Sequence, residues 1–87
     1  MSMLIEHLHG FGTVYYGTQE FAKGVEFDFE LRESSAPGGL PVQRKVVLRI
    51  GDLPRPRPSP LTLRLSDGRK QEFDFSGPDC IAIGLPT

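Results

Sequence analysis

Residues 61–75 constrain the fold more than any other segment, because they combine two alternating patterns with a turn signal. The first half alternates leucine with polar residues, and the second half alternates phenylalanine with acidic residues. A two-residue period is typical of a strand that buries one face. Between the halves, Asp67-Gly68 favours the positive φ angles of a two-residue type I′ turn. The segment therefore predicts a β-hairpin with one buried face, formed by Leu61, Leu63, Leu65, Phe73 and Phe75.

The same alternation appears elsewhere in the chain. Residues 25–32 alternate large apolar with charged side chains, and residues 44–50 place aliphatic side chains at every second position. Shorter strands are expected at 11–16 and 80–83. Turn signals separate these segments. The pattern predicts an all-β fold, either a small antiparallel β-barrel or a β-sandwich, with about six to seven strands.

Two segments near the N-terminus allow more than one structure. Residues 3–9 fit a strand, which we favour, but Ser2 as a cap and Gly10 as a stop also allow a short helical turn. Residues 17–24 fit either one helical turn or a hairpin loop. Residues 33–41 are rich in Gly, Pro and Ser, which predicts a loop.

Length and composition bound the class of protein. The 87 residues predict a single β domain, 1–87. A chain this short buries a small core, and its one cysteine, Cys80, cannot form an intramolecular disulfide. Pairing with a second copy, as a homodimer, would supplement that core. The single thiol, together with no apparent leader and no long apolar run, predicts a cytoplasmic protein without a membrane partner.

Residues 53–60 carry a proline at every second position, 54 to 60. A PxxP ligand is excluded, because no proline lies three residues after another. In an extended chain this spacing removes every N–H donor from one edge. We therefore expect either a stiff crossover or a segment that pairs on one side and protects a sheet edge. Recognition of a partner is the alternative.

Candidates for catalysis or metal binding are few. His7 and His9 would share one face of a strand, but zinc normally needs three or four protein ligands, and nothing in the sequence brings Cys80 or a carboxylate to them. Cys80 precedes an apolar run, which is typical of a small buried hydrophobe. The Gly-Phe-Gly run at 10–12 lacks the third glycine of a phosphate-binding loop. We predict no catalytic residue, no metal and no cofactor.

The net charge of −1 hides an uneven distribution. Residues 1–43 carry six acidic and two basic residues, whereas residues 44–87 carry five acidic and eight basic residues. If the basic residues share a face, they would bind nucleic acid or another anion. We favour the competing interpretation, in which the acidic residues of 26–30 pair across strands with Arg49 or Arg64.

The sequence thus leaves two classes of binding function. The leading hypothesis is a small non-catalytic binding or accessory module that acts through protein–protein contacts or self-association. The alternative is a small β-barrel that binds nucleic acid or another anion through the Arg/Lys-rich region 44–70. The candidate binding residues are four arginines of that region and two adjacent tyrosines: Arg49, Arg55, Arg57, Arg64, Tyr15 and Tyr16.

Overall fold

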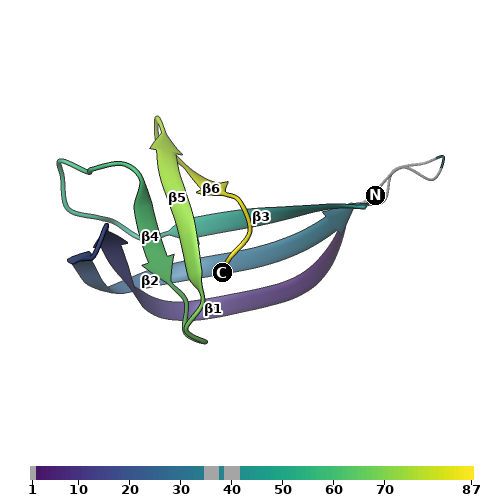
Figure 1. Ribbon diagram of the computed structural model, residues 1–87, viewed down its shortest axis with the longest axis horizontal. Helices are drawn as coiled ribbons and strands as arrows, with labels where there is room; N and C mark the ends of the chain where they lie inside the picture. Colours follow the sequence, from purple (N-terminus) through teal and green to yellow (C-terminus); the bar gives the residue numbers. More distant parts are fainter. Residues whose placement is uncertain (1, 35–37, 39–41) are drawn as a thin grey trace.

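The computed structural model describes residues 2–34, 38 and 42–87, which form strands, turns and one long connection (Figure 1). The strands are β1 (Ser2–Tyr16), β2 (Gln19–Ser34), β3 (Gln43–Ile50), β4 (Leu61–Arg64), β5 (Lys70–Ser76) and β6 (Asp79–Ile83). None of the described residues lies in an α-helix, and none forms a helix that could cross a membrane. The predicted all-β class is confirmed.

All six strands form one antiparallel sheet in the order β3-β2-β1-β4-β5-β6. The long β1–β2 hairpin is curved, and β4 pairs with the end of β1 rather than with β3, its predecessor in the chain (Figure 1). The sheet therefore coils until its two edge strands, β3 and β6, contact each other. Within the described residues no backbone hydrogen bond joins these two edges. The result is a nearly closed antiparallel barrel, one of the two predicted architectures.

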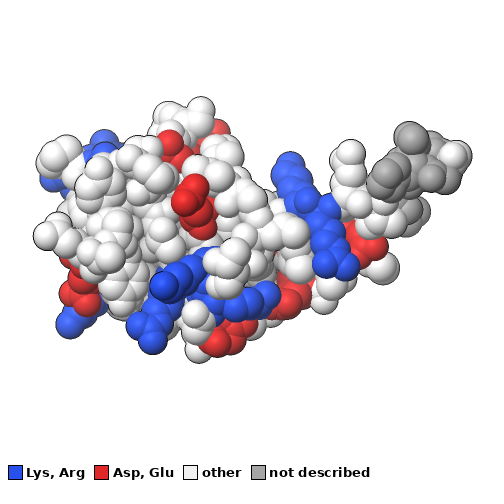
Figure 2. All heavy atoms as spheres, in the orientation of Figure 1, with Lys and Arg blue, Asp and Glu red and all other residues white. Residues whose placement is uncertain are grey.

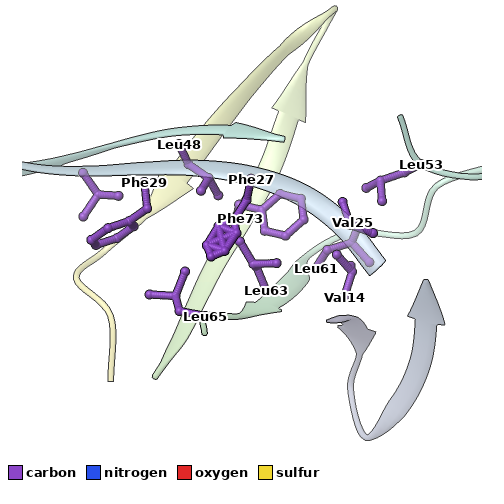
Figure 3. Close-up of a cluster of buried hydrophobic side chains, with 11 residues drawn as sticks. Val14, Val25, Phe27, Phe29, Leu48, Leu53, Leu61, Leu63, Leu65 and Phe73 are labelled. Atoms are coloured by element: carbon purple, nitrogen blue, oxygen red, sulfur yellow. The ribbon is translucent and has the colours of Figure 1, made fainter. Parts of the chain in front are cut away.

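The core lies inside the coiled sheet, where the inward faces of the strands meet (Figure 3). Three phenylalanines from β2 and β5, Phe27, Phe29 and Phe73, are at most 1% exposed. Fully burying such a side chain stabilises a fold by about 1.5–3 kcal/mol. The buried apolar residues are Val14, Val25, Phe27, Phe29, Val46, Leu48, Leu53, Leu61, Leu63, Leu65 and Phe73. The inward faces predicted for residues 25–32, 44–50 and 61–75 are confirmed.

The β4–β5 hairpin forms as predicted, but its turn is different. Leu65 N–H donates to the carbonyl of Arg69 at 2.7 Å, and Gly68 N–H donates to the carbonyl of Leu65 at 3.0 Å. Residues 66–68 therefore form the loop. Gly68 has a φ of 94°, and no described non-glycine residue has a positive φ. The predicted two-residue type I′ turn is wrong; the geometry is that of a three-residue loop with glycine at its left-handed position.

Burial of the hydrophobic face explains the extra loop residue. A two-residue loop at 67–68 would pair Phe73 with Thr62, whose side chain belongs to the outward face. The observed register instead pairs Leu61 with Phe73 and keeps both inside. The same register places Arg64 directly opposite Lys70 on the outer face.

The structure also decides between strand and helical turn for residues 3–9, and between helical turn and hairpin loop for residues 17–24. Residues 3–9 lie in β1, so the favoured strand is confirmed and the helical turn there is wrong. Gly17, with a φ of 62°, and Thr18 form a tight turn, and β2 begins at the next residue. A hairpin therefore forms at this position and the helical turn is wrong, but the loop is shorter than predicted, because residues 19–24 belong to β2. Of the predicted loop at 33–41, the first two residues belong to β2, and most of the others lie outside the described residues.

The proline-rich segment 53–60 is a crossover from β3 to β4 rather than a strand. No backbone hydrogen bond joins it to any described residue, so the predicted one-sided pairing along a sheet edge is wrong. Side chains hold it instead. Leu53 is buried in the core, the Arg57 guanidinium lies 4.0 Å from the centroid of the Phe75 ring, and Ser59 Oγ donates to Asp74 at 2.6 Å. These contacts fix the connection against one end of the barrel.

One polar side chain is fully buried on the inward face of β5. The Gln71 amide nitrogen donates to the backbone carbonyls of Glu72, Ile83 and Gly84, at 2.8, 3.3 and 3.2 Å. The next pairing along β5 is between the backbones of Lys70 and Thr87, which exchange two hydrogen bonds of 2.9 Å. Gln71 therefore ties the end of the chain to the start of β5.

Candidate functional site

The outer face of β1, β2 and β3 carries a network of ion pairs, which we call the ion-pair face. Its centre is Asp28. His7 Nε2 lies 2.5 Å from Asp28 Oδ1, His9 Nδ1 lies 3.9 Å from the same oxygen, and Arg49 Nη1 lies 3.3 Å from Asp28 Oδ2. The hydrogen bond with His7 is the main reason that the pKa of Asp28 is below its usual value. Arg49 also approaches Glu30 at 3.7 Å.

The register explains why these residues meet. His7 is opposite Glu30, His9 is opposite Asp28, and Asp28 is in turn opposite Arg49 on β3. The predicted pairing of the acidic residues of 26–30 with Arg49 is therefore confirmed. The alternative prediction, an ion pair between these acidic residues and Arg64, is wrong. The candidate binding residue Arg49 is exposed, but it pairs with Asp28 and Glu30 of the same chain.

The ion-pair face also places the carboxylates of Asp28 and Glu30 close to His7, a proximity that was not predicted from the sequence. One possible ligand atom from each of His7, Asp28 and Glu30 lies within 4.8 Å of the others. However, Arg49 contacts both carboxylates, and Arg32 Nε donates to Glu30 at 2.9 Å. Arginines thus already pair with both carboxylates. This arrangement is better suited to ion pairing than to metal coordination.

A second candidate lies on the outer face around β4, and we call it the basic depression. It is a concave surface of about 420 Å³ lined by Tyr15, Gly17, Thr18, Thr62, Arg64 and Lys70. Thr62 is opposite Tyr15 on β1, and Arg64 is opposite Lys70 on β5. Figure 2 shows basic side chains gathered where β4 ends and β5 begins. Among the described residues, neither Arg64 nor Lys70 has an ion-pair partner.

A third base near this depression, Arg69, is not available to a ligand. Its guanidinium bonds to Glu6 and to Asp67, and it lies 5.6 Å from the centroid of the Phe29 ring. The hydrogen bond with Glu6 is the main cause of its raised pKa. Arg69 therefore joins the β4–β5 turn to β1, whereas Arg64 and Lys70 on either side of that turn are uncompensated.

The other predicted binding residues are not brought together. Tyr16 is exposed and belongs to the opposite side of β1 from Tyr15, as expected for adjacent strand residues. Arg55 and Arg57 line a separate hollow of about 350 Å³ that also contains Asp74 and Phe75. Of the six candidates, only Tyr15 and Arg64 line the basic depression. Lys70 was missed because the predicted turn length would not place it opposite Arg64, and Thr62 was missed because the pairing of β4 with β1 was not predicted.

The third candidate is a groove of about 390 Å³ between the edge strands, which we call the seam. Its walls are residues 44–48 of β3 and residues 80–82, 84 and 85 of β6 and the chain beyond it. Ile81 and Leu85 are 49% and 48% exposed there. Cys80 also lines the seam, and burial raises the pKa of its thiol to about 11. That thiol is protonated at neutral pH and is a poor nucleophile.

No protein-family model, no curated protein and no solved structure matches this chain. Its function must therefore be inferred from its own residues.

Proposed function

We propose that this protein is a small non-catalytic binding module that takes an extended segment of a partner protein along the seam. The observation that supports this proposal is that both edges of the sheet end at one apolar groove without pairing with each other. An edge strand presents unpaired N–H and C=O groups along its length, and addition of a strand from another protein satisfies them. The same addition would cover Ile81 and Leu85.

The charge of β3 indicates which partner segment fits. β3 contains Arg44, Lys45 and Arg49 but no acidic residue. Along its paired edge it lies against β2, where acidic and large apolar residues alternate. Arg44 and Lys45 line the seam, and Lys45 has no ion-pair partner among the described residues. We therefore infer a partner segment that also alternates apolar and acidic side chains.

Charge also argues against a second copy of this chain as the occupant. β3 carries three basic residues and no acidic residue, so pairing with β3 of another copy would bring basic strands together. Arg44 and Arg49 have acidic partners within the chain, whereas Lys45 has none among the described residues and would contribute most of the repulsion. Like charges on neighbouring strands are destabilising. An acidic segment from a different protein avoids this repulsion and gains cross-strand ion pairs.

The test uses two short synthetic peptides, one alternating Val with Glu and the other alternating Val with Lys. Titration of isotopically labelled protein is expected to show that the Val/Glu peptide protects β3 amides from hydrogen exchange and shifts the resonances of Ile81 and Leu85. The Val/Lys peptide should bind at least tenfold more weakly. Ile81→Asp should also weaken binding of the Val/Glu peptide, because a carboxylate then faces the acidic peptide.

Phe11→Asp is the matched control, since Phe11 is 67% exposed on β1 and does not line the seam. It should leave peptide binding unchanged. Equal affinity for both peptides, or shifts confined to other strands, would contradict the proposal. Light scattering that shows a dimer abolished by Ile81→Asp would replace it with self-association.

A further inference from the structure

We propose that the basic depression binds the phosphate group of a small phosphate monoester, such as a mononucleotide. The site shares no lining residue with the seam, so this activity is separate from the proposed function. Three features of the depression support this proposal: an unfavourable charge pair, the hydroxyl groups around it and the single aromatic ring that lines it.

Arg64 and Lys70 form a cross-strand pair of like charge. Such a pair is destabilising in the free protein. Neither base has an acidic partner within the described part of the chain, although Arg69 beside them has two. A phosphate monoester carries a charge of about −1.5 to −2 at pH 7, which matches these two positive charges. A bound phosphate would therefore turn the repulsion between Arg64 and Lys70 into two favourable contacts.

The surroundings supply neutral donors and a concave shape. Tyr15, Thr18 and Thr62 each carry a hydroxyl group and line the same depression. Hydroxyl groups of Ser, Thr and Tyr commonly donate hydrogen bonds to phosphate oxygens. The volume of about 420 Å³ lies within the range of about 300–1,000 Å³ that is usual for small-molecule sites.

The aromatic content favours a single nucleotide over a nucleic-acid strand. Tyr15 is the one aromatic residue that lines the depression, and it is half-buried. Tyr16 belongs to the other side of β1. Surfaces that bind single-stranded nucleic acid stack successive bases on several aromatic rings. One ring can contact only one base.

Glu72 offers a substitution that should strengthen phosphate binding, whereas the substitutions of Arg64 and Lys70 should weaken it. It lies opposite Thr62 on the outer face of β5, two residues from Lys70. It forms no ion pair with any described residue, so its negative charge opposes an incoming phosphate. Glu72→Gln should therefore tighten phosphate binding.

The experiment is an NMR titration of the full chain at low ionic strength with inorganic phosphate, AMP and a single-stranded oligothymidylate. AMP is expected to shift the amides of Tyr15, Thr62, Arg64 and Lys70, with a dissociation constant of about 1 mM or lower. Arg64→Ala should weaken binding at least tenfold, and Glu72→Gln should strengthen it. Lys70→Glu should abolish binding while raising the midpoint of urea unfolding, which excludes loss of the fold as the explanation.

Arg49→Ala is the matched control, because it removes the same charge from a base that is already paired. It should leave AMP binding unchanged. Equal weakening by Arg49→Ala and Arg64→Ala would show attraction to net charge alone and overturn the proposal. Absence of shifts with both phosphate and AMP would also overturn it, as would much tighter binding of the oligothymidylate than of AMP.

Discussion

The ion-pair face and the basic depression are both outer faces of one sheet, but their charges are arranged in opposite ways. At the centre of the ion-pair face, His9 lies opposite Asp28, and Asp28 lies opposite Arg49 on the next strand. On the basic depression, Arg64 stands opposite Lys70. The first arrangement stabilises the chain by itself, whereas the second becomes favourable when an anion binds. Uncompensated charge on a folded surface therefore points to function more directly than the number of charges does.

The largest expected effect comes from breaking the pairing of β1 with β4, which builds the basic depression. A Cβ on Gly12 would lie 2.4 Å from the carbonyl oxygen of Arg64, so the backbones must separate. Gly12→Ala should lower the free energy of unfolding by about 2 kcal/mol, as overpacking commonly does, and should weaken AMP binding. Urea denaturation measures the first effect.

Gly10→Ala is the control for that change. A Cβ on Gly10 would meet only the ring of Phe27, at 3.9 Å, which is an ordinary contact. It should leave stability unchanged or raise it by about 0.5 kcal/mol. If the two variants lose stability equally, the clash between a Cβ at Gly12 and the backbone of β4 is not the cause of the loss.

Reversing the central charge of the ion-pair face should have the next largest effect. Asp28→Lys removes contacts with His7, His9 and Arg49 and places like charges together. Each exposed pair contributes a few tenths of a kcal/mol to about 1, so the variant should lose about 1–2 kcal/mol by urea denaturation. Asp79→Lys makes the same change at an exposed residue that has no ion-pair partner among the described residues, and it should stay within about 0.5 kcal/mol of the wild type.

The smallest expected effect is the pH dependence of the contribution that Asp28 makes to the free energy of unfolding. The pKa of Asp28 is lowered in the folded chain, chiefly by its hydrogen bond with His7. The folded chain therefore binds fewer protons at this group than the unfolded chain does as the pH falls. The stabilisation is complete above the unfolded pKa of about 4, and it is lost as the pH falls through the folded value. Stability curves of wild type and Asp28→Asn should differ at neutral pH and converge in acid. A gap that stays constant across the acid range would contradict this assignment.

Much of the fold could be predicted because alternation is a local signal. Phe27, Phe29 and Leu63 are buried as predicted, because a two-residue period of apolar residues places them all on the inward face of their strands. The turn at 66–68 could not be predicted from its residues, because Asp67-Gly68 suits two loop lengths. Burial of Phe73 opposite Leu61 selected between them.

The candidate sites depended on that selection and on the closure of the sheet. Arg64 was singled out from the sequence, but Lys70 became its neighbour only through the register of β4 and β5. The seam required β4 to pair with β1, which left β3 and β6 as the two edges. No local pattern specifies such a long-range pairing.

By itself, the sequence determined the class of the fold, the inward face of each main strand and the unequal distribution of charge, because these follow from side-chain type and a two-residue period. The tertiary structure alone decided that Arg49 pairs with Asp28, that Arg64 lies opposite Lys70 and that two strand edges end at one groove. The physical reason is that burial of the core sets strand order and register, and these in turn decide which outer side chains become neighbours.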